Sequence, residues 1–332
     1  MNSPSHPVSN GWLNLPKNLS QIQTPQLILS SGIVNQNKNK CSMTNQFNPQ
    51  ETGDGSYTFY SEEFQEAFHS SFGAKQEAEV RYIEPCQIKQ LAAQKPKIKL
   101  LDVCYGLGYN SAAALDAIWS VNPQCQVELI ALEIAAEVPQ SAISQNLLSC
   151  WQPPVPSLLA QLSKQSIVKT DFFKAELLLG DARQTIQSVS NRNWQADAIF
   201  LDPFSPPKCP QLWTVEFIAL VANCLASQGK LATYSCSAAV RTALLSANLK
   251  ISSITGVGRK SPGTLSCFEY KSLQNLPQKE LEHLKTKAAV PYRDRNLSSS
   301  TAEIVRLRKQ EQQASDLEST SQWRKRWLRS NI

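Results

Sequence analysis

The stretch LLDVCYGLGYNSAAAL, residues 100–115, predicts a buried strand that turns sharply into a helix. Asp102 lies near the end of the apolar run, and Gly106 and Gly108 occupy the turn. Glycine lets a backbone come close to a ligand, and the first turn of a helix offers free N–H donors. Because open α/β sheets bind ligands outside the carboxyl ends of their strands, we expect a nucleotide-like ligand at this turn.

Strands and helices alternate on either side of this turn. Apolar runs of strand length occur at 98–104, 127–133, 175–181, 196–202, 229–235, 250–256 and 264–270. Helical segments begin after Gly108, near 138–149, and at 182–190, 213–226 and 237–247. This alternation predicts an α/β fold with a mostly parallel, seven-stranded sheet covered on both faces. No helix separates the last two strands, so one of them should pair antiparallel, as in the Rossmann-like fold of class I S-adenosylmethionine-dependent methyltransferases.

The chain divides into three regions by composition. Residues 1–45 are rich in Asn, Ser, Gln and Pro without apolar periodicity, which predicts a disordered extension. Residues 46–278 form the main domain, and its cap at about 50–95 has a turn at Asp54–Gly55, an aromatic strand and helical spacing between Phe64 and Phe68. Residues 279–332 predict a basic, helical tail, with a helix at about 301–313 capped within 298–301.

Charge is concentrated at the two ends of the chain. Of the net charge of +6, residues 1–50 carry +3 and residues 279–332 carry +5, so the body is mildly acidic. Basic ends suit contact with a polyanion, although solvated tails have the same composition. The chain has no apolar run of spanning length and no signal-peptide pattern at its start, so we expect a cytoplasmic protein without a membrane association.

Cysteine and histidine usage excludes two classes of site. The nine cysteines include no C-x-x-C pair, and Cys104 and Cys236 fall in expected core strands, so free thiols are predicted. The three histidines are scattered, so we expect no metal.

Acidic residues at the next strand ends complete the predicted ligand site. Glu133 ends the second strand, where a carboxylate can accept both hydroxyls of a ribose. Asp181, followed by Ala182, ends the third strand, where it can accept an adenine amine, cap the next helix, or do both. Ser111 replaces the third glycine of the dinucleotide fingerprint, which favours adenosylmethionine over NAD.

The fourth strand carries the sharpest signal, IFLDPFSPPKCPQLW, residues 199–213. Asp202 emerges at the edge of the sheet beside Phe204, an acid–proline–aromatic pattern typical of enzymes that methylate amino nitrogens. The carboxylate would hold the nucleophilic amine and stabilise its developing charge, while the ring packs on the substrate base. The same carboxylate also favours the unreactive ammonium before reaction, so its role as base or as positioning group stays open.

Five motifs occur in the order found in a known family: DGSYTFYSEEFQEAFHS, D-x-x-Y-G-L-G-Y-N, G-D-A, L-D-P-F-S-P-x-K-x-P-x-L-W and G-V-G-R-K. Together with PYRD at 291–294, they resemble the methyltransferase domain of the MnmC-type tRNA 5-methylaminomethyl-2-thiouridine biosynthesis proteins. The resemblance covers about residues 50–310 and implies that Tyr105 and Asn110 belong to the cofactor site. It departs at Pro203, where many members have glycine.

The resemblance implies N-methylation of a 5-aminomethyl group on the wobble uridine of tRNA, with adenosylmethionine as donor. Nothing in the sequence resembles the family's flavin oxidase domain, so no FAD and no obligate protein partner are expected. Candidate RNA-contacting groups are the basic tail and a set of side chains from the main domain: Tyr57, Lys208, Arg241, Arg259 and Lys260. Phe59 and Phe204 are alternative rings for stacking on an extruded base.

Two other functions share part of this pattern. A polyamine-type aminopropyltransferase has the same fold and acids around an amine, but its Gly-Gly-Gly-Asp-Gly-type turn differs from YGLGYN. A non-catalytic tRNA-binding protein could retain the fold, but the set Gly106, Glu133, Asp181 and Asp202 argues against it.

Overall fold

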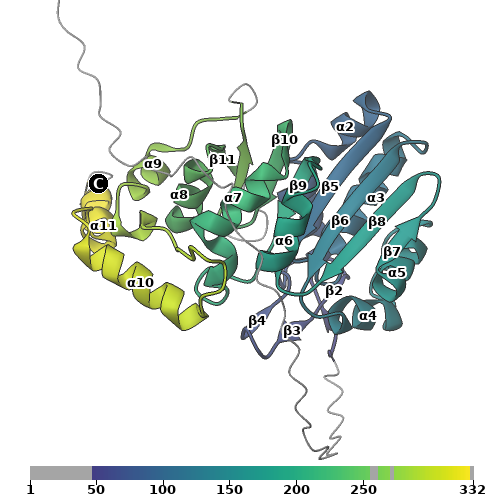
Figure 1. Cartoon of the computed structure of the whole chain (residues 1–332), viewed down its shortest axis with the longest axis horizontal. Helices are drawn as coiled ribbons and strands as arrows, with labels where there is room; N and C mark the ends of the chain where they lie inside the picture. The colour runs from purple at the N-terminus through teal and green to yellow at the C-terminus, as the bar shows by residue number, and fades with distance from the viewer. Residues whose placement is uncertain (1–46, 255–260, 270–272, 330–332) are drawn as a thin grey trace, which may run out of the picture. The chain divides into compact units, whose positions relative to one another are not determined.

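One eight-stranded sheet organises the protein (Figure 1). The computed structural model describes residues 47–254, 261–269 and 273–329, so the predicted extension 1–45 lies outside the described residues. The strand order is β11-β12-β10-β9-β5-β6-β8-β7. The strands are β5 Lys97–Val103, β6 Gln126–Glu133, β7 Ile167–Lys169, β8 Phe173–Leu179, β9 Ala196–Leu201, β10 Leu225–Thr233, β11 Lys250–Ile254 and β12 Gly263–Cys267.

The predicted fold class is confirmed. Strands β10, β9, β5, β6 and β8 pair in parallel, and β12 lies antiparallel to both β10 and β11. The sheet has eight strands rather than the seven expected, because β7 adds an antiparallel edge next to β8. Its three residues include only one buried side chain, Val168, so no apolar run marks it in the sequence.

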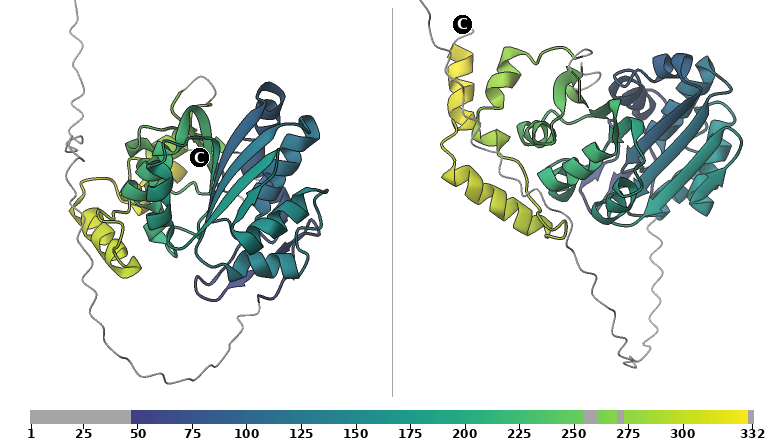
Figure 2. Two further views of the ribbon diagram at one scale, coloured as in Figure 1. Left: turned by 45° about the vertical axis from the view of Figure 1, so that its right-hand side comes forward. Right: turned by 45° about the horizontal axis from the view of Figure 1, so that its top comes forward.

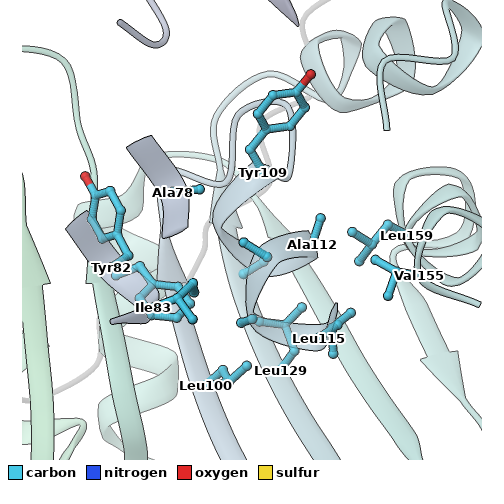
Figure 3. Packing of buried hydrophobic residues seen from close by; sticks show 14 of the residues in the cluster. Ala78, Tyr82, Ile83, Leu100, Tyr109, Ala112, Leu115, Leu129, Val155 and Leu159 are labelled. Carbon is cyan, nitrogen blue, oxygen red and sulfur yellow. The ribbon is translucent and has the colours of Figure 1, made fainter. Parts of the chain in front are cut away.

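Helices supply a separate buried cluster for each face of the sheet. Alternation along β5 sends Leu100 into one cluster and Leu101 into the other. The first cluster includes residues of α1 Ala74–Ala78, the π-helix η1 Glu79–Ile83, α2 Ile88–Gln94, α3 Tyr109–Val121, α4 Glu137–Ser144 and α5 Val155–Gln165 (Figure 3). The second includes residues of α6 Ala182–Ser190, the 3₁₀ helix η2 Pro210–Trp213, α7 Val215–Asn223 and α8 Ala238–Ser246. Helix α5 has no counterpart in the sequence prediction.

The N-terminal cap consists of two small hairpins, β1 Gln50–Glu51 with β2 Tyr57–Thr58, and β3 Tyr60–Ser61 with β4 Glu66–Ala67. The turn at Asp54–Gly55 is confirmed, and Gly55 has a φ of 78°. The helical expectation around Phe64 and Phe68 was wrong, because Gln65 adopts a left-handed φ of 53° that turns β3 into β4.

The tail is helical, as predicted, and it packs on the main domain. It comprises α9 Gln278–His283, η4 Lys287–Ala289, α10 Thr301–Ala314 and α11 Thr320–Arg329 (Figure 2). Ser300 caps α10 by accepting a hydrogen bond of 3.2 Å from the Glu303 amide. Ile304 and Tyr292 are buried in the second core cluster, so tail and main domain share apolar packing. Shared burial of this kind stabilises the docked tail.

Two further expectations concern membrane-spanning helices and the state of the cysteine thiols. None of the helices described here has the length and apolar character that a bilayer crossing requires. The cysteines of the described ranges are free, but Cys104 and Cys236 follow β5 and β10 instead of lying within those strands.

We predict that Gly108→Ala destabilises the fold more than Gly55→Ala. Both glycines have a positive φ, 88° and 78°, so each substitution costs about 1–2 kcal/mol of left-handed strain. A Cβ at Gly108 would also lie 2.5 Å from the hydroxyl of buried Tyr105, whereas nothing lies within 4 Å of one at Gly55. Overpacking at Gly108 should therefore cost about 1–3 kcal/mol more in urea unfolding. Equal losses for the two variants would contradict this reading.

Candidate active site

A cavity of about 710 Å³ opens at the carboxyl ends of four neighbouring parallel strands. Its lining includes Gly106 after β5, Glu133 at the end of β6, Asp181 after β8 and Asp202 after β9. Strand β5 lies between β6 and β9, where the chain reverses its direction of winding, and ligands of open α/β sheets bind at such a point. Residues of the β3–β4 hairpin also line the cavity. The volume of the cavity falls in the range of small-molecule sites, about 300–1,000 Å³.

Glu133 holds the turn that follows β5. One carboxylate oxygen accepts a hydrogen bond of 2.7 Å from the Gly106 amide, and the other accepts from Ile134 and Ala135 at 2.9 and 3.0 Å. Burial raises the pKa of the Glu133 carboxyl, and these three amides offset part of that rise. Oε1 already accepts two hydrogen bonds and Oε2 accepts one, so Oε2 keeps acceptor capacity for a ribose hydroxyl.

The turn at Gly106 has little room for a side chain. Its φ is +55°, and a Cβ there would lie 3.3 Å from the ring of Phe68, which also lines the cavity. Together with Glu133, this glycine turn fits adenosylmethionine, which needs close backbone approach without a pyrophosphate cradle.

Asp202 receives a hydrogen bond on each carboxylate oxygen. The Tyr82 hydroxyl donates to Oδ1 at 2.5 Å, and the Asn110 amide donates to Oδ2 at 2.9 Å. Figure 3 shows the Tyr82 hydroxyl directed away from the aliphatic cluster. Burial, together with Asp202, raises the pKa of Tyr82 well above its usual value, so Tyr82 stays a neutral donor. Two donors, one on each oxygen, fix the orientation of the carboxylate.

Phe204 stands beside Asp202 in a loop that several contacts fix. Its ring stacks on Phe64 with centroids 4.4 Å apart and meets Phe68 edge-on at 5.0 Å. The Trp213 indole donates to the Phe204 carbonyl, and the Tyr234 hydroxyl donates to the Pro203 carbonyl, both at 2.9 Å. These contacts hold the acid and the ring in one orientation toward the cavity.

Glu66 ties the β3–β4 hairpin to the same loop. Its two carboxylate oxygens accept hydrogen bonds from the backbone amide and the hydroxyl of Ser205, the amide at 2.9 Å. The hairpin therefore covers the site as part of its wall rather than as a separate layer.

Asp181 caps α6, one of the two roles expected for it. Its Oδ1 accepts from the Arg183 amide at 2.9 Å, and the Arg183 guanidinium bonds both oxygens at 2.7–3.2 Å. Partial burial opposes ionisation, but the Arg183 hydrogen bonds and charge prevail and lower the pKa of Asp181. Asp181, Ala182 and Arg183 all line the cavity.

Other predicted cofactor residues lie behind the wall of the cavity. The Asp102 side chain is fully buried and accepts a hydrogen bond of 2.6 Å from Ser111 on α3. The Tyr105 ring packs under Gly108, and Asn110 supports Asp202. Their side chains support the turn instead of lining the cavity.

The predicted RNA contacts have mixed outcomes. The prediction for Arg241 was wrong, because its buried guanidinium bonds Glu280, Thr264 and Ser253. Phe59 is fully buried and packs on Phe47, so it is no platform for a base.

The geometry does not test the RNA-contact predictions for Lys208, Arg259 and Lys260, and Tyr57 is not among the residues that line the cavity. Lys208 is exposed, and Arg259 and Lys260 lie outside the described residues. Tyr57 is half-buried, and its amide donates to the Tyr109 hydroxyl at 3.1 Å. No metal-binding group of three or more His, Cys, Asp or Glu side chains occurs within the described ranges.

The sequence reasoning missed Tyr82, Tyr234 and Glu66. Tyr82 lies in a π-helix, a rare insertion often found at functional sites, and no periodicity distinguishes it from the α-helix before it. Tyr234 directly follows β10, so the strand-end rule used for Glu133 and Asp202 could have found it.

Comparisons with known proteins identify the family of the chain. The family described as S-adenosyl-L-methionine-dependent methyltransferase matches residues 145–268. The crystal structure of MNMC2 from Aquifex aeolicus superposes with a TM-score of 0.72 and 32% identity, covering 81% of this chain and 86% of that one. The chain belongs to this MnmC-type methyltransferase family. The family resemblance expected from the sequence is thereby confirmed, as is dependence on adenosylmethionine.

Two further relatives define how far the similarity extends. The uncharacterized protein MJ0670 of Methanocaldococcus jannaschii is 30% identical over 268 residues, 78% of the methyltransferase and 71% of that relative. The tRNA 5-methylaminomethyl-2-thiouridine biosynthesis bifunctional protein MnmC of an Acidovorax species is 26% identical over 213 residues. That alignment covers 61% of the methyltransferase but only 33% of the bifunctional protein.

We predict that Tyr82→Phe reduces methyl transfer while adenosylmethionine affinity stays within about twofold. The variant removes the 2.5 Å hydrogen bond to Asp202 without changing the packing of the ring. Losing a hydrogen bond to a charged group costs about 1.5–3 kcal/mol, so turnover should fall about tenfold or more. A quenched activity assay would measure turnover, and calorimetry would measure the affinity for adenosylmethionine. Tyr292→Phe, which changes a similarly buried tyrosine of the tail, is the matched control.

Proposed function

We propose that this methyltransferase methylates the 5-aminomethyl group of the wobble uridine in tRNA and produces 5-methylaminomethyl(-2-thio)uridine. The name of the MnmC relatives and the similarity to MNMC2 support this proposal. The chain spans about a third of the bifunctional MnmC proteins that it matches, so their substrate is applied here to one part of their length.

The observation that carries the proposal is the fixed Asp202 beside Phe204 in the cavity that also holds Gly106 and Glu133. A carboxylate beside an aromatic ring matches a substrate with an amine on a planar base. Tyr82 and Asn110 each use their hydrogen bond on Asp202, so its oxygens are oriented before the substrate arrives. Preorganised acceptors of this kind lower the barrier to reactions that develop positive charge.

The proposed chemistry is a displacement at carbon. Adenosylmethionine supplies an electrophilic methyl group, and the amine nitrogen of the substrate is the nucleophile. Asp202 accepts an N–H of the amine and so directs the nitrogen lone pair toward the methyl group, because in-line geometry carries much of the rate. As the N–C bond forms, the S–C bond to the methyl group breaks with its electron pair left on sulfur, and S-adenosylhomocysteine is the leaving group. The carboxylate stabilises the cationic nitrogen, which then releases its proton toward Asp202 or solvent.

The two donors on Asp202 also bear on the protonation of the amine before reaction. The Tyr82 and Asn110 hydrogen bonds spread the negative charge of the carboxylate, which reduces its tendency to hold the amine as an unreactive ammonium. We therefore assign Asp202 a positioning and electrostatic role ahead of a role as strong base.

Contact with tRNA rests on groups outside the cavity. Lys208 is exposed in the loop that carries Asp202 and Phe204, where a phosphate of the bound anticodon loop could reach it. The wobble base is unpaired, so it can enter a pocket at small cost.

The direct test uses tRNA that carries 5-aminomethyl-2-thiouridine, purified enzyme and adenosylmethionine, with nucleoside analysis by mass spectrometry. We expect 5-methylaminomethyl-2-thiouridine to appear and the unmethylated nucleoside to disappear. A parallel reaction with decarboxylated adenosylmethionine and putrescine tests the aminopropyltransferase alternative. A spermidine product without tRNA methylation would replace the proposed function, and tight tRNA binding with no product in either reaction would indicate a binding protein.

We predict that Asp202→Asn lowers turnover by at least about a hundredfold, the range typical of a positioned acid–base group. Adenosylmethionine affinity should stay within about tenfold, because the cofactor-binding turn is held by Glu133 and not by Asp202. Asp197→Asn is the control, since Asp197 lies in β9, the strand that directly precedes Asp202, and pairs with Lys95 at 2.5 Å. A folded Asp202→Asn enzyme with turnover equal to that of the control would remove Asp202 from the mechanism.

A further inference from the structure

Arg183 connects the cavity to the C-terminal tail. On one side its guanidinium bonds both oxygens of Asp181, with the shortest distance 2.7 Å from Nη2. On the other side Nη1 donates at 2.9 Å to the Asp294 carboxylate and at 2.9 Å to the Ser299 carbonyl. Asp294 and Ser299 are more than a hundred residues away in sequence and belong to the segment that directly precedes α10.

Asp294 is the better anchored of the two acids. Its side chain is 0% exposed, whereas that of Asp181 is 37% exposed. The other Asp294 oxygen accepts the Ser298 and Ser299 amides at 3.1 and 3.0 Å. A buried carboxylate that accepts hydrogen bonds on both oxygens is a rigid support for an arginine.

We infer that the tail segment 294–299 is part of the adenosylmethionine site, with Asp294 positioning Asp181 through Arg183. In this arrangement Asp294 is a positioning residue, because it acts on the ligand only through Arg183 and Asp181. The tail then sets cofactor affinity, a role separate from any contact with tRNA.

The exposures explain why Asp181 needs this support. A partly exposed ion pair on its own is worth about 0–1 kcal/mol, because solvent screens it and two side chains must be immobilised. The buried carboxylate of Asp294 and the Ser299 carbonyl already immobilise Arg183. Asp181 is thus already fixed in orientation before the ligand binds. Ligand binding then loses little side-chain entropy at Asp181, which favours affinity.

The inference rests on Asp181 contacting adenosylmethionine. Thermodynamic linkage adds a second requirement, which concerns the docking of the tail. If the docked tail strengthens cofactor binding, cofactor binding must strengthen tail docking by the same factor. Amides that are held by Asp294, such as those of Ser298 and Ser299, should therefore exchange more slowly with the cofactor bound.

The first experiment compares Asp294→Asn with Gln184→Ala in the full chain. The asparagine keeps the volume but places an N–H₂ group toward Arg183, where two donors repel. We expect the dissociation constant of adenosylmethionine, measured by calorimetry, to rise about tenfold. The KM for adenosylmethionine should rise with it, while kcat at saturation stays within about twofold.

Gln184→Ala is the matched control for tail docking. Gln184 adjoins Arg183 in α6, is exposed, and its side chain bonds the tail at the Leu297 carbonyl at 3.3 Å. Its bond to Asp181 joins the backbone amide to the Asp181 carbonyl, and the alanine variant keeps that bond. Loss of the Gln184 side chain should leave cofactor affinity unchanged. An equal effect of both variants would mean that the tail acts only through general stability, and it would overturn the inference.

A double-mutant cycle separates this inference from its premise. Asp181→Asn alone should weaken cofactor binding, and adding Asp294→Asn to it should produce little further loss. If Asp181→Asn has no effect, the premise fails. If Asp181→Asn weakens binding but Asp294→Asn does not, the inference fails while the proposed methylation stands.

Hydrogen exchange on the unmodified protein gives a result that does not depend on a variant folding. Slower exchange at 298–299 on addition of adenosylmethionine, with no change in α11, supports the coupling. Unchanged exchange at 298–299 at saturating adenosylmethionine contradicts it.

Discussion

A carboxylate that is partly withdrawn from water needs hydrogen-bond donors, and the Asp202 carboxylate obtains them from two elements that pack in the same core cluster. Tyr82 comes from the π-helix η1 and Asn110 from the first turn of α3. Both elements must be in place for the carboxylate to be held. The cap, the glycine turn and the central strand are therefore joined at one side chain, and the geometry of the site depends on that junction.

This junction explains why several residues near the cavity do not face it. Tyr105 fills the space beneath Gly108, and a side chain at Gly108 would collide with it. Asn110 faces Asp202 because the left-handed Gly108 begins α3 at the required angle. Supporting residues of this kind place the acid without needing to touch a ligand.

Sequence reasoning was most successful where the chain follows regular periodicity. Apolar runs located β5, β6, β8, β9, β10, β11 and β12, and the strand-end rule placed Glu133, Asp181 and Asp202 in one cavity. It failed where long-range contacts decide the outcome. Arg241 looks like any exposed basic residue of a helix, yet its partner Glu280 comes from α9, 39 positions later. The Asp294–Arg183 contact, 111 positions apart, is equally invisible to local patterns.

The stacking of Phe64 on Phe204 bears on how strongly the site can hold an aromatic ring. A ring that binds to the covered face of Phe204 must first displace Phe64, so one stack is exchanged for another. Aromatic pairs between side chains contribute about 0.5–1.5 kcal/mol, and a nucleobase on an aromatic side chain contributes about 1–3 kcal/mol. The net attraction for the incoming ring is the difference between these two stacking energies, and it is small. Selectivity among aromatic ligands at this face of Phe204 therefore depends on the polar groups at the edge of the ligand ring. An aromatic molecule without such groups would compete poorly with the substrate.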